Sequence, residues 1–271
     1  TKTSELQIQI YDRNKAILSC VSLDKNGAYV TKTNRIFSDA SCSEDGSKIA
    51  YVTSLPLVPA HTTNASHAYY RNLISGELTL LRDERNQKAT KIAISGDGNF
   101  VYFTGTGKLW KYTVSTGQLT ELISSGMDDI KPATDVRGSI LAYSQNGKAV
   151  LQGSGQVPDL TCSALRLSRD GKVLAVLDSD KGLHIWFADA PQLVTLAENV
   201  EEFAMNQSGT EVFFLQDEKL YRQNTALGVK AEVLLPAGIT ATNLKNLQVS
   251  GNGRFLTWVR SLTLNEVTYP G

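Results

Sequence analysis

Three histidines are the residues of this chain best suited to metal or acid–base chemistry, but their spacing does not favour it. His61 and His67 share the longest predicted loop without a nearby carboxylate, and His184 alternates with apolar residues in a predicted strand. Zinc needs three or four ligands in tight geometry. We therefore predict no metal, expect His61 and His67 to be exposed loop side chains, and expect His184 to be a hydrogen-bonded structural residue.

Nucleophilic and glycosidase chemistry are also poorly supported. The sequence contains no Gly-x-Ser-x-Gly elbow, the turn that exposes a nucleophilic serine. A glycosidase needs two carboxylates that face each other, whereas Asp128-Asp129 and Glu201-Glu202 are adjacent pairs. Adjacent residues of a strand point to opposite faces. We predict no catalytic residue and no cofactor.

The elements that would position any site come from one repeated unit. A Ser, Asp or Asn is followed three residues later by glycine, and then by an apolar run such as Phe100-Val101-Tyr102-Phe103. Asp-Gly and Asn-Gly pairs supply the positive φ angles of tight hairpins, and a preceding Ser or Asp can bond the turn backbone. The repeated glycines average about 41 residues apart, the length of a four-stranded propeller blade; they are Gly46, Gly98, Gly138, Gly171, Gly209 and Gly253.

This repeat predicts an all-β chain, because no long segment has helical periodicity. We predict one domain over residues 1–271, a six-bladed β-propeller with four-stranded antiparallel blades. The last turn is followed by only one clear strand, so the N-terminal strands 6–13 and 16–21 are expected to complete the sixth blade. That blade would be shared between residues 1–23 and 243–271, and the closure would bury sheet edges.

Two groups of residues are candidates for binding. The first lies on the innermost strands, which line the channel of a propeller. Its charges have both signs, so two interpretations remain open: a solvated channel wall whose charges balance one another, or a binding site for a polar ligand. The group consists of Asp39, Lys91, Lys131, Arg166 and Glu202. The second lies on the long segments 55–70 and 24–35, because long loops on a rigid scaffold usually carry recognition; its candidates are His61, His67, Tyr69 and Tyr70.

Composition narrows the classes of partner. The 27 basic and 27 acidic residues give a formal net charge of zero, which argues against a nucleic-acid partner. The apolar runs are too short to span a bilayer. Of three cysteines, Cys42 and Cys162 are expected to be buried free thiols, and a Cys20–Cys42 disulfide is the alternative. The chain starts at Thr1, which we interpret as a processed end or the boundary of a larger polypeptide.

The repeat resembles that of the TolB-like β-propellers, whose WD-type units carry a Ser-Pro-Asp-Gly-like turn before an Ile-Ala-Phe-like strand. The residues that carry this resemblance are Ser43-Glu44-Asp45-Gly46 before Lys48–Val52, together with Leu57-Val58-Pro59, Tyr11–Asn14 and Arg71–Gly76. No turn here contains Pro, and the third has Val136-Arg137 where Pro-Asp is usual. The resemblance implies a bacterial periplasmic or extracellular binding scaffold.

These observations predict a non-enzymatic module that binds a protein or a glycan through loops on one face of the ring. Two alternatives remain. One is a propeller hydrolase or lactonase that acts at the channel mouth. The other is a structural spacer within a larger surface protein.

Overall fold

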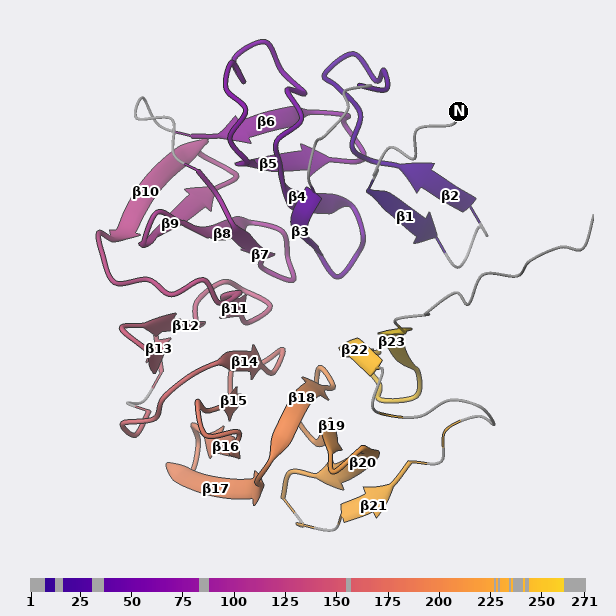
Figure 1. Ribbon diagram of the computed structural model, residues 1–271. Helices are drawn as coiled ribbons and strands as arrows, with labels where there is room; N and C mark the ends of the chain where they lie inside the picture. The colour runs from indigo at the N-terminus through magenta and orange to yellow at the C-terminus, as the bar shows by residue number, and fades with distance from the viewer. Residues whose placement is uncertain are drawn as a thin grey trace, which may run out of the picture. The chain divides into compact units, whose positions relative to one another are not determined.

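The computed structural model describes residues 8–12, 17–30, 37–82, 88–154, 157–226, 228, 230–233, 235, 241 and 244–260, and contains no α-helix in these ranges (Figure 1). The chain divides into two compact units, Thr1–Leu160 and Thr161–Gly271. Each unit consists of antiparallel sheets, and within a sheet each strand pairs with the strand that follows it in the chain. The predicted all-β class is therefore confirmed for the described residues.

The first unit contains one two-stranded, two four-stranded and one three-stranded sheet. In chain order they are β1 (Gln9–Asp12) and β2 (Ile17–Cys20); β3 (Phe37–Cys42), β4 (Lys48–Thr53), β5 (His67–Asn72) and β6 (Leu78–Leu81); β7 (Lys91–Ile94), β8 (Phe100–Gly105), β9 (Lys108–Thr113) and β10 (Gln118–Ile123); and β11 (Ala133–Thr134), β12 (Leu141–Gln145) and β13 (Lys148–Gln152).

The second unit contains two four-stranded sheets and a two-stranded one. They are β14 (Ala164–Leu167), β15 (Val173–Leu177), β16 (Leu183–Phe187) and β17 (Gln192–Ala197); β18 (Val200–Met205), β19 (Glu211–Gln216), β20 (Lys219–Asn224) and β21 (Lys230–Glu232); and β22 (Leu244–Val249) and β23 (Leu256–Arg260).

The repeated turn joins the first and second strands of six sheets. Each of its glycines has φ between +67° and +76°, and its N–H donates to the carbonyl three residues earlier at 2.8–3.2 Å. In the first copy, Ser43 Oγ accepts from Lys48 N at 3.0 Å and donates to Asp45 Oδ1 at 2.6 Å. These bonds confirm the predicted turn chemistry: positive φ from glycine, and a register fixed by the side chain before it.

The turns also connect one sheet to the next within each unit. Glu44 N donates to Gly96 O at 2.9 Å, and Gln207 N donates to Gly251 O at 3.2 Å. Each of four turn glycines lies against the preceding sheet of the same unit, at the residue two positions after that sheet's turn glycine. A Cβ added to the glycine would collide with that residue; the pairs are Gly98 with Lys48, Gly138 with Phe100, Gly209 with Val173, and Gly253 with Glu211. Successive sheets in a unit are thus related in one repeated way, as the blades of a propeller are.

The hydrophobic core lies between successive sheets. The second strands β4, β8, β15 and β19 are almost completely buried, as expected for strands covered on both faces. Trp110 and Trp186 are 2% and 6% exposed. These two tryptophans therefore belong to the sheet core and form no exposed aromatic surface.

The two-stranded sheets at the chain ends correspond to the strands of the predicted shared blade. β1 pairs with β2 through Gln9↔Cys20, and β22 pairs with β23 through Leu244↔Arg260. Joining these hairpins into one blade, and the count of six blades, stay predictions. Residues 1–7, 13–16, 31–36 and 261–271, which include parts of the predicted closure and of the 24–35 loop, lie outside the described residues.

All three cysteines are free thiols. The expected burial of Cys162 is confirmed, but that of Cys42 is wrong, since Cys42 is exposed. It ends β3, whose residues alternate between half-buried and exposed, and it falls on the exposed side. The alternative of a Cys20–Cys42 disulfide is likewise not realised.

Candidate binding surfaces

Asp39 and Lys131, two candidates from the inner strands, meet in the first unit. Asp39 Oδ1 accepts from Lys131 Nζ at 2.7 Å, and Lys131 Nζ also donates to Ala40 O at 2.8 Å. Asp39 Oδ2 accepts from Ile92 N at 2.9 Å. The side chain of Asp39 thus connects its own strand β3 to β7 and to the segment before β11.

Glu202 has the same function in the second unit. Its Oε1 accepts from Leu247 N at 2.6 Å. Asp39 and Glu202 each stand four residues before the first residue of their turn, and each bonds the first strand of the next sheet. That strand has one edge without a partner strand, and its N–H groups need acceptors. These carboxylates therefore cap sheet edges, and a further role in binding a ligand stays a prediction.

The other two inner-strand candidates have different surroundings. Lys91 is half-buried at the start of β7. In β14, Arg166 Nη1 donates to Leu165 O at 2.8 Å, and the guanidinium lies over the ring of Phe203 at 5.6 Å. This placement matches a packed cation–π contact. Binding of a ligand at Lys91 or Arg166 also stays a prediction.

The two loop histidines are buried, contrary to expectation. His61 is 3% and His67 0% exposed. His61 Nδ1 lies 2.7 Å from Tyr69 Oη and its Nε2 3.1 Å from Ala65 O, while His67 Nε2 lies 2.9 Å from Thr63 Oγ1. The two imidazoles meet edge to face, with ring centres 4.5 Å apart. These contacts lie on the buried side of the loop between β4 and β5 and connect the loop to β5.

Tyr69 and Tyr70 are also buried, so the expectation of exposed aromatic residues here is wrong. Both belong to β5, and they are 0% and 1% exposed. Tyr69 stacks on Tyr51, with ring centres 5.7 Å apart. Desolvation raises the pKa of Tyr69 above its usual value, and raises that of Tyr70 to about 12. In this conformation none of these four side chains is exposed enough to contact a partner.

The two segments predicted to form one binding face do lie together. Arg71, which is 7% exposed, donates from Nη2 to Leu23 O at 2.8 Å and to Asp24 O at 2.7 Å. Lys25 N donates to Leu57 O at 3.3 Å. We call residues 24–30 and 58–66 the paired-loop surface. Its exposed side chains include Lys25, Asn26, Tyr29, Pro59, Thr62 and Asn64.

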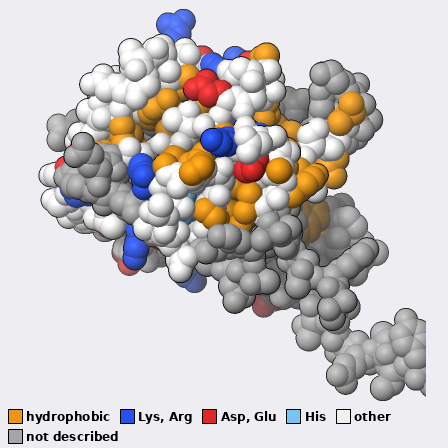
Figure 2. All heavy atoms as spheres, turned by 90° about the horizontal axis from the view of Figure 1, so that it is seen from above, with side chains coloured by type: hydrophobic (Ala, Val, Ile, Leu, Met, Phe, Trp, Pro, Cys, Tyr) orange, Lys and Arg blue, Asp and Glu red, His pale blue; other side chains and the backbone are white. Residues whose placement is uncertain are grey.

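The face of the molecule seen in Figure 2 carries isolated charges of both signs. Hydrophobic side chains lie between them, and no large region of a single sign is visible there. Tyr29 is 66% exposed and is the most exposed aromatic side chain described.

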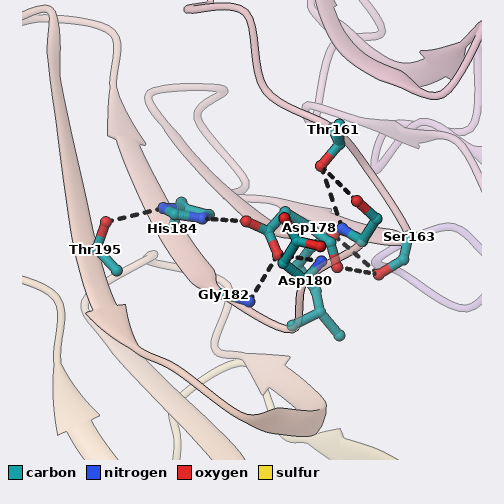
Figure 3. A network of polar contacts seen from close by, with 9 residues as sticks. Thr161, Ser163, Asp178, Asp180, Gly182, His184 and Thr195 are labelled. Carbon is teal, nitrogen blue, oxygen red and sulfur yellow. Dashed lines mark hydrogen bonds and ion pairs between the residues drawn. The ribbon is translucent and has the colours of Figure 1, made fainter.

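A network around His184 is the most enzyme-like arrangement in the second unit (Figure 3). His184 Nε2 lies 2.8 Å from Asp178 Oδ2, and Nδ1 lies 3.0 Å from Thr195 Oγ1. Asp178 Oδ1 accepts from Asp180 N at 2.9 Å and Gly182 N at 2.7 Å. Partial burial opposes ionisation of Asp178, but the bonds from His184 and the backbone outweigh it, so its pKa is lowered.

A hydroxyl, an imidazole and a carboxylate in a row could in principle activate a nucleophile. Here Thr195 stands directly opposite His184 in the β16–β17 register, so the contact is what neighbouring strands produce. A cavity of about 430 Å³ in this unit is lined by Gln192 and Val194, which alternate with Thr195 and lie on the other face of β17. The arrangement confirms the expected structural role of His184.

Sequence reasoning missed Asp178 and Thr195 as its partners. The signal for Asp178 was present: an Asp four residues before Gly182, at the start of a hairpin, typically accepts bonds from the turn backbone. No comparable signal marked Thr195, because its position opposite His184 depends on the register of the two strands. Among the described residues, no three His, Cys, Asp or Glu side chains are grouped to hold a metal.

None of the described segments forms a helix long and apolar enough to cross a membrane. No protein-family model and no curated protein sequence matches this chain. Among solved structures, the chain is similar to TolB from Acinetobacter baumannii, with a TM-score of 0.52 and 18% identity. The match covers 86% of this chain but 61% of that protein, so the chain spans less than two thirds of its length. At this identity the likeness shows the fold alone: the sheets of this chain follow a TolB-like β-propeller fold.

Proposed function

We propose that this chain is a non-enzymatic binding module that recognises a protein or a glycan through the paired-loop surface. The observation that carries the proposal is the guanidinium of Arg71, buried beneath the surface and bonded to the consecutive carbonyls of Leu23 and Asp24, where the 24–30 segment begins. Burying a charged group is costly, and hydrogen bonds offset that cost; Arg71 Nη2 makes both bonds to the loop, while its Nε has no partner among the described residues. The two bonds fix the loop in one conformation, which lowers the entropic cost of binding.

The second half of the paired-loop surface, residues 58–66, is also fixed by buried side chains beneath it. Buried Leu57 and His61 hold the 58–66 segment, while Pro59, Thr62 and Asn64 face solvent. A rigid base with exposed tips is what recognition loops need. The TolB-like fold is consistent with a protein of the bacterial periplasm, which we propose as its location.

Point substitutions test this proposal better than removal of the loop. Replacing residues 57–66 would delete Leu57 and His61, which are 1% and 3% exposed, and would damage the core. We therefore choose the triple variant Tyr29→Ala, Thr62→Ala and Asn64→Ala, which alters three exposed residues of the paired-loop surface. The matched control is Ile74→Ala, which alters a side chain 84% exposed in the β5–β6 turn.

The wild type, the triple variant and the control should be compared on a glycan array and in cross-linking with envelope extract of the source. A ligand retained by the wild type and Ile74→Ala but lost by the triple variant would support the proposal. A ligand retained equally by all three would place binding elsewhere.

The hydrolase alternative, stated for the channel mouth, can be tested at the row Thr195–His184–Asp178, although the register of β16 and β17 accounts for this row without catalysis. Hydrolysis of a lactone or ester panel by the wild type, abolished by Thr195→Val, would establish it. The spacer alternative predicts that no variant changes any interaction.

A further inference from the structure

The fourth and last sheet of the first unit has an incomplete outer edge. It contains β11, β12 and β13, whereas the two preceding sheets have four strands each (Figure 1). In the sheet before it, the fourth strand β10 covers β9 from Thr113 to Leu109. The equivalent edge of β13 has no such partner strand among the described residues.

A short remnant of the fourth strand remains at one end of β13. The third strands β9, β13 and β20 all begin with lysine, and each lysine pairs with a carboxylate of the segment alongside; the pairs are Lys108–Glu121, Lys148–Asp159 and Lys219–Glu232. Next to Asp159, Leu160 O accepts from Ala149 N at 2.9 Å. Before Asp159 stands Pro158, which has no N–H to donate, so the pairing ends there.

The rest of β13 keeps backbone groups free for another strand. Because Ala149 N points away from β12, the N–H and C=O of Leu151, two residues on, point the same way. Within the described chain neither group of Leu151 has a hydrogen-bond partner. An unpaired strand edge of this kind is a template for the addition of a strand.

A pocket of about 160 Å³ adjoins this edge. It is lined by Tyr102, Lys111 and Leu122 from the preceding sheet and by Gln152 and Gly153 at the end of β13. In the preceding sheet, the position equivalent to Gln152 is Tyr112, which pairs with Leu119 of β10. Leu119 packs into the core between its own sheet and the one before it. The pocket thus lies where a fourth-strand leucine would be buried.

We infer that the open edge of β13 is a docking site for a short extended segment of a partner protein that places a leucine in this pocket. The chain itself indicates the chemistry of that segment. Three of its four described fourth strands, β6, β10 and β17, have a leucine followed by a β-branched residue, whereas β21 (Lys-Ala-Glu) has none; the three pairs are Leu78-Thr79, Leu119-Thr120 and Leu193-Val194. The docked segment would pair with Leu151 through the backbone and bury its leucine beside Tyr102 and Leu122. The site is separate from the paired-loop surface and does not depend on it.

The probe is a synthetic peptide with the sequence of residues 117–123, Gly-Gln-Leu-Thr-Glu-Leu-Ile, added to the full chain. Amide exchange followed by NMR should show a fast-exchanging Leu151 N–H in the free protein, which the peptide slows. The N–H of Val150, which faces β12, should be protected throughout. A Leu151 amide that is already protected without peptide would overturn the inference.

Substitutions on both partners test the pocket. Asp in place of the first leucine of the peptide, or Gln152→Trp in the protein, should weaken binding at least ~10-fold, the effect expected from losing one buried leucine. The matched control, Gln118→Trp on β10, should leave affinity unchanged. Equal binding by both peptides would refute the pocket. A concentration-dependent dimer abolished by Gln152→Trp would instead identify a second copy of this chain as the donor and overturn the choice of partner.

Discussion

Removing the carboxylate of Asp39 tests whether the charged inner strands serve the fold. In Asp39→Ala, Ile92 N loses its acceptor at 2.9 Å and Lys131 Nζ loses its partner at 2.7 Å. The Ile92 side chain is fully buried, so little water is available to replace the acceptor. The change therefore leaves a donor unsatisfied at the edge of β7.

The magnitude follows from the two contacts. An unsatisfied buried donor costs about 1–3 kcal/mol. The ion pair adds about 0–1 kcal/mol, because the side chains of Lys131 and Asp39 are 37% and 15% exposed. We expect Asp39→Ala to lower the free energy of unfolding by about 1–4 kcal/mol. Asp39→Asn keeps an acceptor for Ile92 N and should cost less than about 1 kcal/mol.

Urea unfolding followed by tryptophan fluorescence measures these differences. The control is Asp159→Ala, which removes an ion pair to Lys148 whose side chains are 56% and 75% exposed and should change stability by less than about 0.5 kcal/mol. If Asp39→Ala is no more destabilising than Asp159→Ala, the carboxylate does not cap the edge of β7. A ligand site would then be the better explanation of its place on the inner strand.

Three further predictions concern the turns and the loop. Hydrogen bonds from Ser43 and Ser47 lower the pKa of Asp45 from 3.8 to about 2. The stability that the Asp45 carboxylate contributes is therefore present above about pH 4 and is lost as the pH falls toward 2. Ser43→Ala should raise the pKa of Asp45 in an NMR titration, and an unchanged pKa would show that the Ser43 hydrogen bond does not lower it. Gly209→Ala should destabilise the second unit by more than about 1 kcal/mol, because φ is +71° and the new Cβ would lie 2.7 Å from a side-chain carbon; a thermal midpoint equal to that of the wild type would refute this. His61→Ala should expose the 54–66 segment to limited proteolysis, and unchanged resistance would show that the imidazole does not hold the loop.

The sequence predicted the parts of the fold that local chemistry determines. The turn around Ser43 and Gly46 needs a hydroxyl, a carboxylate and a positive φ within four residues, so its pattern is visible in the chain. The inner-strand position of Asp39 was also predictable, because it lies a fixed distance before the turn. Its partner, Ile92 N, was not, since that contact depends on how two sheets pack.

The residues of the 55–70 segment show what the sequence could not predict, namely the burial of their side chains. A long segment with two histidines and no strand pattern was expected to be exposed, but its exposure depends on what lies beneath it. Tyr69 and Arg71, both in β5, bond His61 and the carbonyl groups at residues 23 and 24. Spacing along the chain says nothing about such contacts. Part of the predicted 55–70 loop lies between β4 and β5, but its residues from His67 onward belong to β5, and its four binding candidates are buried.

The repeat itself separates structural residues from candidates for recognition. A polar side chain that performs the same contact in more than one sheet, as Asp39 and Glu202 do, belongs to the scaffold, because every sheet must satisfy its first strand. Recognition must therefore come from features that the sheets do not share. Two such features are the paired-loop surface, present beside one sheet, and the open edge of β13, where one sheet lacks what its neighbours have. Loss of binding through substitution of either feature, with the repeated contacts intact, is the result that this reasoning requires.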